Sequence, residues 1–284
     1  MKFGFVMPFG DATEIADAAV AAEGAGWDAL FAWEAVWGNH AWVSLTAAAM
    51  LTESIRLGTM LTPVPRYKPW DLTSLVGTLD RLSGGRVILG AGLGALHSGW
   101  TAFEPDEGRR VRVQRLNETL DIYAGLMQGQ PFSYRGAHYA VTNTDFFVPK
   151  PPVQRPHPPV WLVGASKAGA DLQPSLERAA RWEGWLPQVI DGEFRGKPRS
   201  PEELAGLTAE VHHLREAAGL DPSSIDVCFE GQFYGEDATE DDIEVWAQAG
   251  ATWWVEGAWG LPNDDGGREE VIRRLTLGPP RQES

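Results

Sequence analysis

Short apolar runs alternate with amphipathic stretches along almost the whole chain. Eight of these runs are predicted to be β-strands, at Phe3–Met7, Ala29–Trp33, Ile55–Met60, Val87–Gly90, Val160–Val163, Gly184–Leu186, Val227–Phe233 and Trp253–Glu256. Runs this short and this apolar are typical of parallel strands that are covered on both faces.

Segments with apolar residues at helical spacing lie between the predicted strands. In the first of them, apolar positions recur from Ile15 to Ala22, and glycines follow at 24 and 26. A later segment opens with Ser200-Pro201-Glu202-Glu203, which places a capping hydroxyl before a proline at the first helical position. Alternating strands and helices predict a parallel sheet, and eight such units favour an α/β fold that closes into a (β/α)8 TIM barrel.

One segment departs from this alternation, at residues 129–159, between the fourth predicted helix and the fifth predicted strand. It contains two short runs, Phe132–Tyr134 and His138–Val141, on either side of Arg135-Gly136, and a proline-rich stretch follows. This pattern predicts a β-hairpin and then an extended crossing. We therefore expect a single domain over residues 1–284 that carries an insertion at 129–159.

A glycine-rich stretch follows the fourth predicted strand, with glycines at 90, 92 and 94. Ligands of parallel α/β proteins bind beyond the carboxyl ends of the strands, so this stretch indicates the working face. Its spacing differs from the dinucleotide pattern G-x-G-x-x-G. Two interpretations stay open: the glycines allow a flat ring system to lie against the backbone, or they allow tight strand packing.

Composition and charge exclude several classes of partner. The formal net charge is -15, which argues against a nucleic acid as the main partner, because phosphate binding needs a basic face. No apolar run approaches the roughly 20 residues of a membrane span, so no membrane partner is expected. A single cysteine, Cys228, fits a reducing, cytoplasmic location and a buried structural thiol. No residues have the spacing of a metal site.

Five segments together carry a resemblance to a known family. They are Ala22–Asp28, Leu57–Pro69, Asp80–Gly94, Pro149–Pro156 and Arg178–Gly184. In this order they resemble the bacterial luciferase-like flavin-dependent oxidoreductases. The resemblance implies a TIM barrel that binds reduced FMN or the deazaflavin coenzyme F420 at its C-terminal face, with an insertion after the fourth helix.

The resemblance also implies where the cofactor binds. The loop expected at Gly164-Ala165-Ser166-Lys167 would hold the cofactor phosphate, since a glycine admits backbone N–H groups and Ser166 and Lys167 add a hydroxyl and a charge. A plain strand-to-helix turn is the alternative. Members of the family often have a strained, sometimes cis, peptide bond near Met60-Leu61-Thr62, which places Leu61 under the central ring. Gly92 would lie beside that ring.

Candidate catalytic and substrate residues follow from strand ends. Glu34 stands where F420-using relatives have an Asp-His pair, and the imidazole is missing because Ala35 follows it. His97 is a second candidate acid or base, with a surface-loop histidine as the alternative. Trp33, Gln232 and Glu256 end predicted strands, and we expect them to touch substrate.

The predicted function is that of a luciferase-like oxidoreductase acting on a small organic substrate. A monooxygenase that uses reduced FMN and O₂ is favoured. An F420-dependent hydride-transfer dehydrogenase or reductase is the alternative, because the segment from Thr62 to Pro69 leans toward F420-using relatives. A non-catalytic flavin-binding protein and a cofactor-free barrel lyase also stay open, as does a homodimer.

Overall fold

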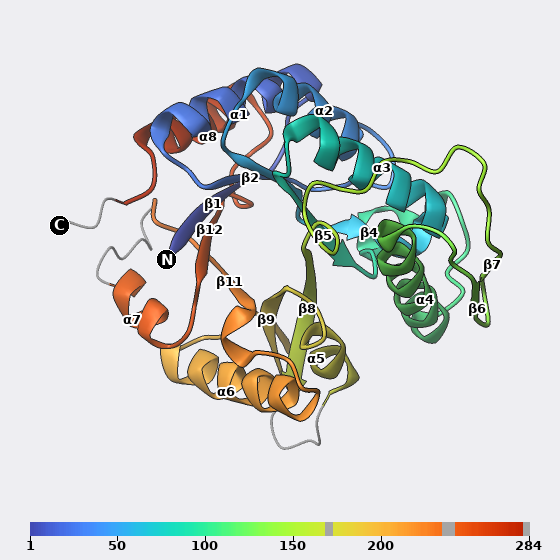
Figure 1. Cartoon of the computed structure of the whole chain (residues 1–284). Coiled ribbons are helices and arrows are strands. Elements are labelled where there is room, and N and C mark those ends of the chain that lie inside the picture. The colour runs from blue at the N-terminus through green and yellow to red at the C-terminus, as the bar shows by residue number, and fades with distance from the viewer. Residues whose placement is uncertain (168–172, 235–241, 281–284) are drawn as a thin grey trace.

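Eight parallel strands form a closed ring in the computed structural model, which describes residues 1–167, 173–234 and 242–280 (Figure 1). The ring runs β1 (Lys2–Met7), β2 (Ala29–Ala32), β3 (Arg56–Thr59), β5 (Val87–Gly92), β8 (Val160–Lys167), β9 (Gly184–Asp191), β11 (Asp226–Gly231) and β12 (Trp253–Gly257). β12 pairs in parallel with β1, and this pairing closes the ring. The predicted TIM barrel and its eight strands are confirmed.

Helices surround the ring of strands (Figure 1). They are α1 (Ala12–Ala25), α2 (Ala41–Leu51), α3 (Pro69–Ser83), α4 (Arg109–Gln128), α5 (Pro174–Ala179), α6 (Pro201–Ala217), α7 (Asp242–Gln248) and α8 (Asp265–Leu277). The first begins at a capping box in which the Asp11 carboxylate accepts from backbone N–H groups and Glu14 reaches back to the Asp11 N–H. Short elements complete the chain: β4 (Thr62–Pro63), β6 (Tyr134–Arg135), β7 (Ala140–Val141), β10 (Phe194–Gly196) and the 3₁₀ helices η1 (Val64–Arg66), η2 (Leu96–Ser98), η3 (Trp100–Ala102) and η4 (Pro222–Ser224).

Large side chains fill the interior of the barrel. Trp161 lies against Trp253 with ring centroids 5.1 Å apart, and against Phe31 at 5.5 Å. Gly4 and Gly58 make room for this packing, because a Cβ at either position would lie 2.7 Å from the Phe31 ring. The barrel centre is therefore a packed core rather than a channel, and ligands are confined to its ends.

β8 and β9 extend beyond the barrel, which corrects one expectation. They stay paired from Trp161 opposite Gly184 to Lys167 opposite Ile190, and β10 adds an antiparallel third strand. Residues 164–167 are therefore strand rather than the expected loop. The physical reason is the neighbouring strand, which supplies hydrogen-bond partners to a segment whose own composition is typical of a turn.

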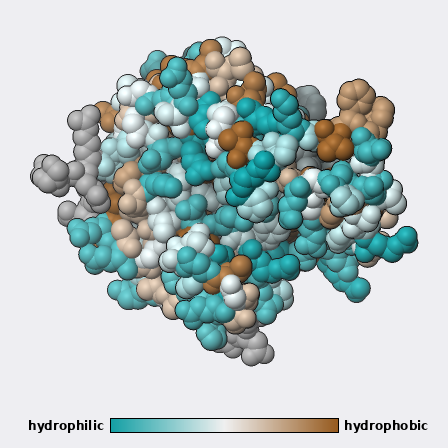
Figure 2. Space-filling view, in the orientation of Figure 1, coloured by the Kyte–Doolittle hydropathy of each residue, from teal (hydrophilic) through white to brown (hydrophobic). Residues whose placement is uncertain are grey.

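The insertion between α4 and β8 contains the predicted hairpin, in which β6 and β7 pair antiparallel. Glu118 of α4 holds this hairpin, because its carboxylate accepts from the backbone N–H groups of residues 137–139 at 2.8 to 3.0 Å. Polar residues cover most of the face shown in Figure 2, with small apolar patches between them. Within the described residues, no helix combines the length and apolar character needed to span a bilayer.

A carboxylate at the N-terminal side of the barrel generates a pH-dependent prediction. Burial opposes ionisation of Glu23, but the N–H groups of Glu53, Ser54 and Ile55 and the Ser54 hydroxyl donate to it and lower its pKa to about 2. This stabilisation is present above the ordinary carboxyl pKa of 4.5 and is lost as the pH falls toward 2. Because Glu23 is partly exposed, we expect Glu23→Gln to reduce the free energy of unfolding at pH 7 by only about 1–2 kcal/mol.

Urea denaturation at pH 7 and pH 2.5 measures this effect. The difference between Glu23→Gln and the wild type should shrink at the lower pH, whereas the exposed control Glu216→Gln should change stability by less than about 0.5 kcal/mol at both. An equal loss at both pH values would show that the Glu23 charge does not stabilise this turn.

Candidate active site

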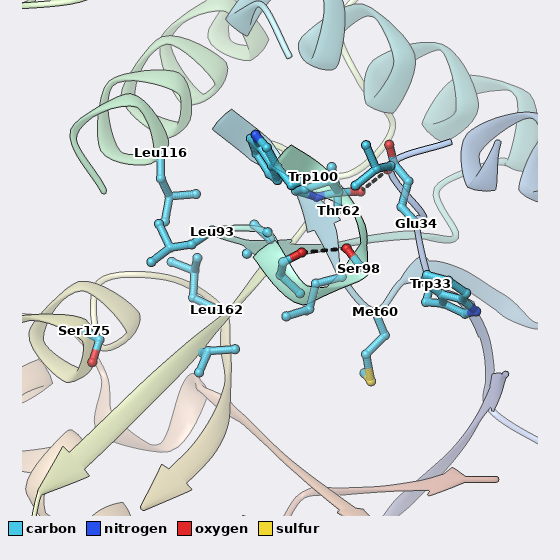
Figure 3. A pocket seen from close by; sticks show the side chains of 18 of the residues that line it. Trp33, Glu34, Met60, Thr62, Leu93, Ser98, Trp100, Leu116, Leu162 and Ser175 are labelled. Atoms are coloured by element: carbon cyan, nitrogen blue, oxygen red, sulfur yellow. Dashed lines mark hydrogen bonds between the residues drawn. The ribbon is translucent and has the colours of Figure 1, made fainter. Parts of the chain in front are cut away.

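A cavity of about 420 Å³ lies at the carboxyl ends of β2, β3, β5 and β8 (Figure 3). This is the face that the sequence indicates. Its walls come from strand ends, the η2–η3 segment, α4, α5 and the segment after β12. They include Trp33, Glu34, Met60, Leu61, Thr62, Gly92, Leu93, His97, Trp100, Arg109, Leu116, Leu162, Ala165, Ser175, Arg178 and Trp259. Eight of the thirteen site residues proposed from sequence line this cavity: Trp33, Glu34, Met60, Leu61, Thr62, Gly92, His97 and Ala165.

Glu34 is the half-buried acid of the cavity. Its carboxylate accepts a short hydrogen bond from the Tyr67 hydroxyl, and its second oxygen lies 3.1 Å from Thr62 Oγ1. Burial raises the Glu34 pKa, and the hydrogen bonds and the nearby charges of His40 and Arg66 oppose that rise. An acid with a raised pKa suits proton transfer near neutral pH.

The peptide bond between Met60 and Leu61 is cis, as the resemblance implies for some members of the family. Leu61 packs against the glycines of β5. A Cβ at Gly90 would lie 1.9 Å from the Thr59 carbonyl oxygen, and one at Gly92 would lie 3.2 Å from the Leu61 side chain. Of the two interpretations of the glycine-rich stretch, tight strand packing is supported at Gly90, and Gly92 also lines the cavity.

The opposite end of the cavity is basic. Arg109 at the start of α4 and Arg178 in α5 both line it, beside Ser175, and Figure 3 places Ser175 across the cavity from Glu34. Burial lowers the pKa of Arg178, and the charge of Arg109 lowers it further. The Nε atom of Arg178 is buried without a hydrogen-bond partner, and within the described ranges neither arginine forms an ion pair. Two neighbouring unpaired cations attract an anion such as a phosphate.

Three residues of the expected phosphate loop do not line this cavity. Gly164 faces α5, where an added Cβ would lie 3.1 Å from Ala179 and Leu176. Ser166 and Lys167 lie further along β8, opposite Val189 and Ile190 of β9. Of the expected loop, only Ala165 lines the cavity, and its N–H donates to Ser175 Oγ at 3.2 Å.

Two expected substrate residues also lie outside it. Trp253 and Val255 of β12 point into the barrel, so the alternation of the strand turns Glu256 outward. There Glu256 is fully buried and pairs with Arg274 of α8 at 3.3 Å. Gln232 lies just beyond β11, and its amide donates to the Gly257 carbonyl at 3.2 Å. Both side chains bond to the protein itself.

Four residues in or beside the cavity stand out among those that the sequence analysis missed. Arg109 and Arg178 come from different helices, and only the closed barrel brings them together. Tyr67 is within a segment that carries the family resemblance, but only the fold brings its hydroxyl to Glu34. Trp259 lies in the cavity wall, and its Nε1 donates to Glu230 at 2.7 Å. The described residues hold no group of three or more His, Cys, Asp or Glu placed to bind a metal.

Comparison with known proteins identifies the family. A family model described as luciferase-like monooxygenase matches residues 1–276, which is nearly the whole chain. The chain belongs to the luciferase-like monooxygenase family. The resemblance carried by the five sequence segments is therefore confirmed.

Two relatives that match part of the chain are described as uncharacterized proteins. A protein of Sinorhizobium fredii is 34% identical over 120 residues, which is 42% of this chain and 33% of that protein. A protein of Mycobacterium bovis is 29% identical over 176 residues, 62% of this chain and 54% of its own length. The matches thus span a third to about half of these relatives.

Solved structures share the fold. A coenzyme F420-dependent tetrahydromethanopterin reductase from Methanopyrus kandleri superposes with a TM-score of 0.74 at 17% identity, over 98% of both chains. The oxygenating component of 3,6-diketocamphane monooxygenase from Pseudomonas putida, solved with FMN, superposes with a TM-score of 0.64 at 19% identity, over 82% of this chain and 67% of its own. The same fold thus occurs in a protein named as F420-dependent and in one solved with FMN.

The packing at Gly90 generates a prediction for the strand that carries the cavity floor. Because an added methyl group would meet the Thr59 carbonyl, we expect Gly90→Ala to lower the free energy of unfolding by about 3 kcal/mol. Gly206 in α6 has open space around its Cα, so the control Gly206→Ala should instead stabilise by about 0.5–1 kcal/mol. Urea denaturation without cofactor measures the stability of both variants. If Gly90→Ala were as stable as the wild type, packing would not require this glycine.

Proposed function

We propose that this protein is an oxidoreductase that binds a flavin-type cofactor in the cavity, with the ring beside Leu61 and the phosphate at Arg178 and Arg109. The observation that carries the proposal is a pair of arginines, without an anionic partner among the described residues, at one end of an otherwise mostly apolar cavity. An anionic tail and a flat apolar ring match these two ends.

The residues present fit such a group. The orphaned Arg178 Nε supplies a buried donor, Arg109 adds a second guanidinium, and Ser175 adds a hydroxyl on the same wall. Leu61, Leu93 and Leu162 provide apolar surface for the ring. Although the chain has a net charge of -15, the charge next to the tail site is positive, so the overall charge does not oppose an anionic cofactor.

F420-dependent hydride transfer is the reaction that the site supports best. The cofactor would supply or accept the hydride, and such a transfer to a carbonyl or imine also requires a proton. Glu34 lines the cavity with a raised pKa and meets that need. The superposition with the F420-dependent reductase over 98% of both chains adds support, since the two chains agree in size as well as in fold.

A monooxygenase that uses reduced FMN and O₂ on a small organic substrate is the second candidate. The observation that favours it is the apolar wall of Leu93, Trp100 and Leu116, which would exclude water from an oxygen-activating centre. Under either reaction, Trp33, His97 and Trp259 are the candidates to contact substrate, because they line the cavity beside the ring site.

Fluorescence titration with F420 and with FMN tests the cofactor and the tail site together. We expect Arg178→Gln to weaken binding of the preferred cofactor by about 10- to 100-fold, as for the loss of one charge-assisted hydrogen bond. The matched control is Arg181→Gln, because Arg181 borders other pockets and should leave affinity within about twofold. Absence of binding of either cofactor to the wild type would overturn the redox proposal and favour a cofactor-free barrel enzyme.

A further inference from the structure

Four hydroxyl and carbonyl groups extend the Glu34 site into the barrel wall. Glu34 Oε2 lies 3.1 Å from Thr62 Oγ1, which in turn lies 3.0 Å from Thr59 Oγ1. The last contact runs from Thr59 Oγ1 to the Gly90 carbonyl oxygen at 3.0 Å. On the other carboxyl oxygen of Glu34 the Tyr67 hydroxyl donates.

The number of protons in this chain of contacts favours one charge state of Glu34. Gly90 O only accepts, so Thr59 donates its one proton there. Thr62 also has one proton but two close oxygens, on Thr59 and on Glu34. With Glu34 ionised, Thr62 serves only one of them, and two oxygens stay 3.0 to 3.1 Å apart with no proton between them. With Glu34 protonated on Oε2, each of the three contacts is a hydrogen bond.

Solvent does not supply the missing proton to the two threonines. Thr59 and Thr62 are fully buried, so their hydroxyls depend on partners within the chain. The protonated state of Glu34, in which all three contacts are hydrogen bonds, is therefore favoured over the ionised state, in which two buried oxygens are in contact without a hydrogen between them. The geometry favours the neutral form of Glu34 independently of its burial.

The charged groups around Glu34 do not reverse this preference. His40 at the start of α2 and Arg66 of η1 favour the carboxylate, but neither forms an ion pair with it within the described part of the chain. Arg66 instead donates to the carbonyls of Ala35 and Val36 at 3.2 and 2.6 Å. Burial and the Glu34 charge raise the Tyr67 pKa, so the Tyr67 hydroxyl keeps its proton and stays a donor.

We propose that Glu34 stores a proton at neutral pH and delivers it to an oxygen or nitrogen acceptor of the substrate, such as a carbonyl or imine, while Tyr67 is the positioning residue that orients its carboxyl group. The inference deepens the proposed function and rests on it for the identity of the reaction. In the transfer, the O–H bond of Glu34 breaks and the substrate acceptor takes the proton. A bound cofactor would supply the hydride that makes this acceptor basic.

The same network stabilises the carboxylate that remains. After the transfer, Thr62 turns its proton from Thr59 to Glu34, and Tyr67 continues to donate to the other oxygen. Glu34 thus keeps its hydrogen bonds with Thr62 and Tyr67 in both charge states, and only the Thr62 hydroxyl has to rotate, which leaves the Thr62–Thr59 contact without a proton. The Thr62 hydroxyl therefore donates to Thr59 when Glu34 is protonated and to Glu34 when it is ionised.

The test is a titration of Glu34 by NMR in the protein without cofactor, with ¹³C-labelled glutamate carboxyl groups and Glu34→Gln to assign the signal. We expect Glu34 to be mostly protonated at pH 7 in the wild type. Thr59→Val removes the acceptor of the Thr62 proton, which then serves the Glu34 carboxylate, so the midpoint should fall by about one pH unit. Because Thr59 does not touch Glu34, burial alone predicts no change for this variant.

Tyr67→Phe should move the midpoint the other way, because it removes a donor that favours the carboxylate. Thr46→Val and Tyr134→Phe are the matched controls, since neither residue belongs to the network, and both should leave the midpoint unchanged. A wild-type Glu34 that is mostly ionised at pH 7, or an unchanged midpoint in Thr59→Val and Tyr67→Phe, would overturn the proposal. Because no cofactor is present, this outcome is separate from a failure of the cofactor titration.

Discussion

The parallel pairing of β1 with β12 is the interaction on which the rest of the structure depends. It joins the first and last strands of the ring, so that every strand ends at the same rim. Alternate side chains of the strands point inward, where Phe31, Trp161 and Trp253 are the largest members of a buried cluster that fills the interior. With the centre filled, a cavity forms only above it, from residues at and beyond the strand ends.

The strands and the working face are predictable from sequence because they depend on local patterns. A short apolar run is typical of a strand covered on both faces, whichever strands lie beside it. The apolar runs alone therefore predict all eight strands of the barrel. The position of Glu34 at the end of β2 has the same local basis. Local patterns do not show which strand lies beside another. β8 continues to Lys167 only because β9 lies beside it and supplies its hydrogen-bond partners.

Orientation and long-range proximity limit the prediction of the site. Glu256 lies next to the last residue of β12, close to its expected place, but the pleat of the strand turns it toward Arg274. One residue of register decides between a rim ligand and a structural ion pair, and no feature of the run itself sets that register. Arg109 and Arg178 are 69 residues apart in the chain, so their shared cavity follows from the fold.

The two ends of the cavity constrain each other electrostatically. An ionised Glu34 would place a second anion in the cavity that receives an anionic cofactor tail, in a setting where water screens charges poorly. A protonated Glu34 removes that repulsion, and the only formal charges then facing the tail site are those of Arg109 and Arg178 among the described residues that line the cavity. The hydroxyl chain from Thr62 to Gly90 therefore does more than satisfy buried oxygens. By keeping Glu34 neutral until a substrate takes its proton, it makes the acid of the site compatible with the cation pair that binds the cofactor.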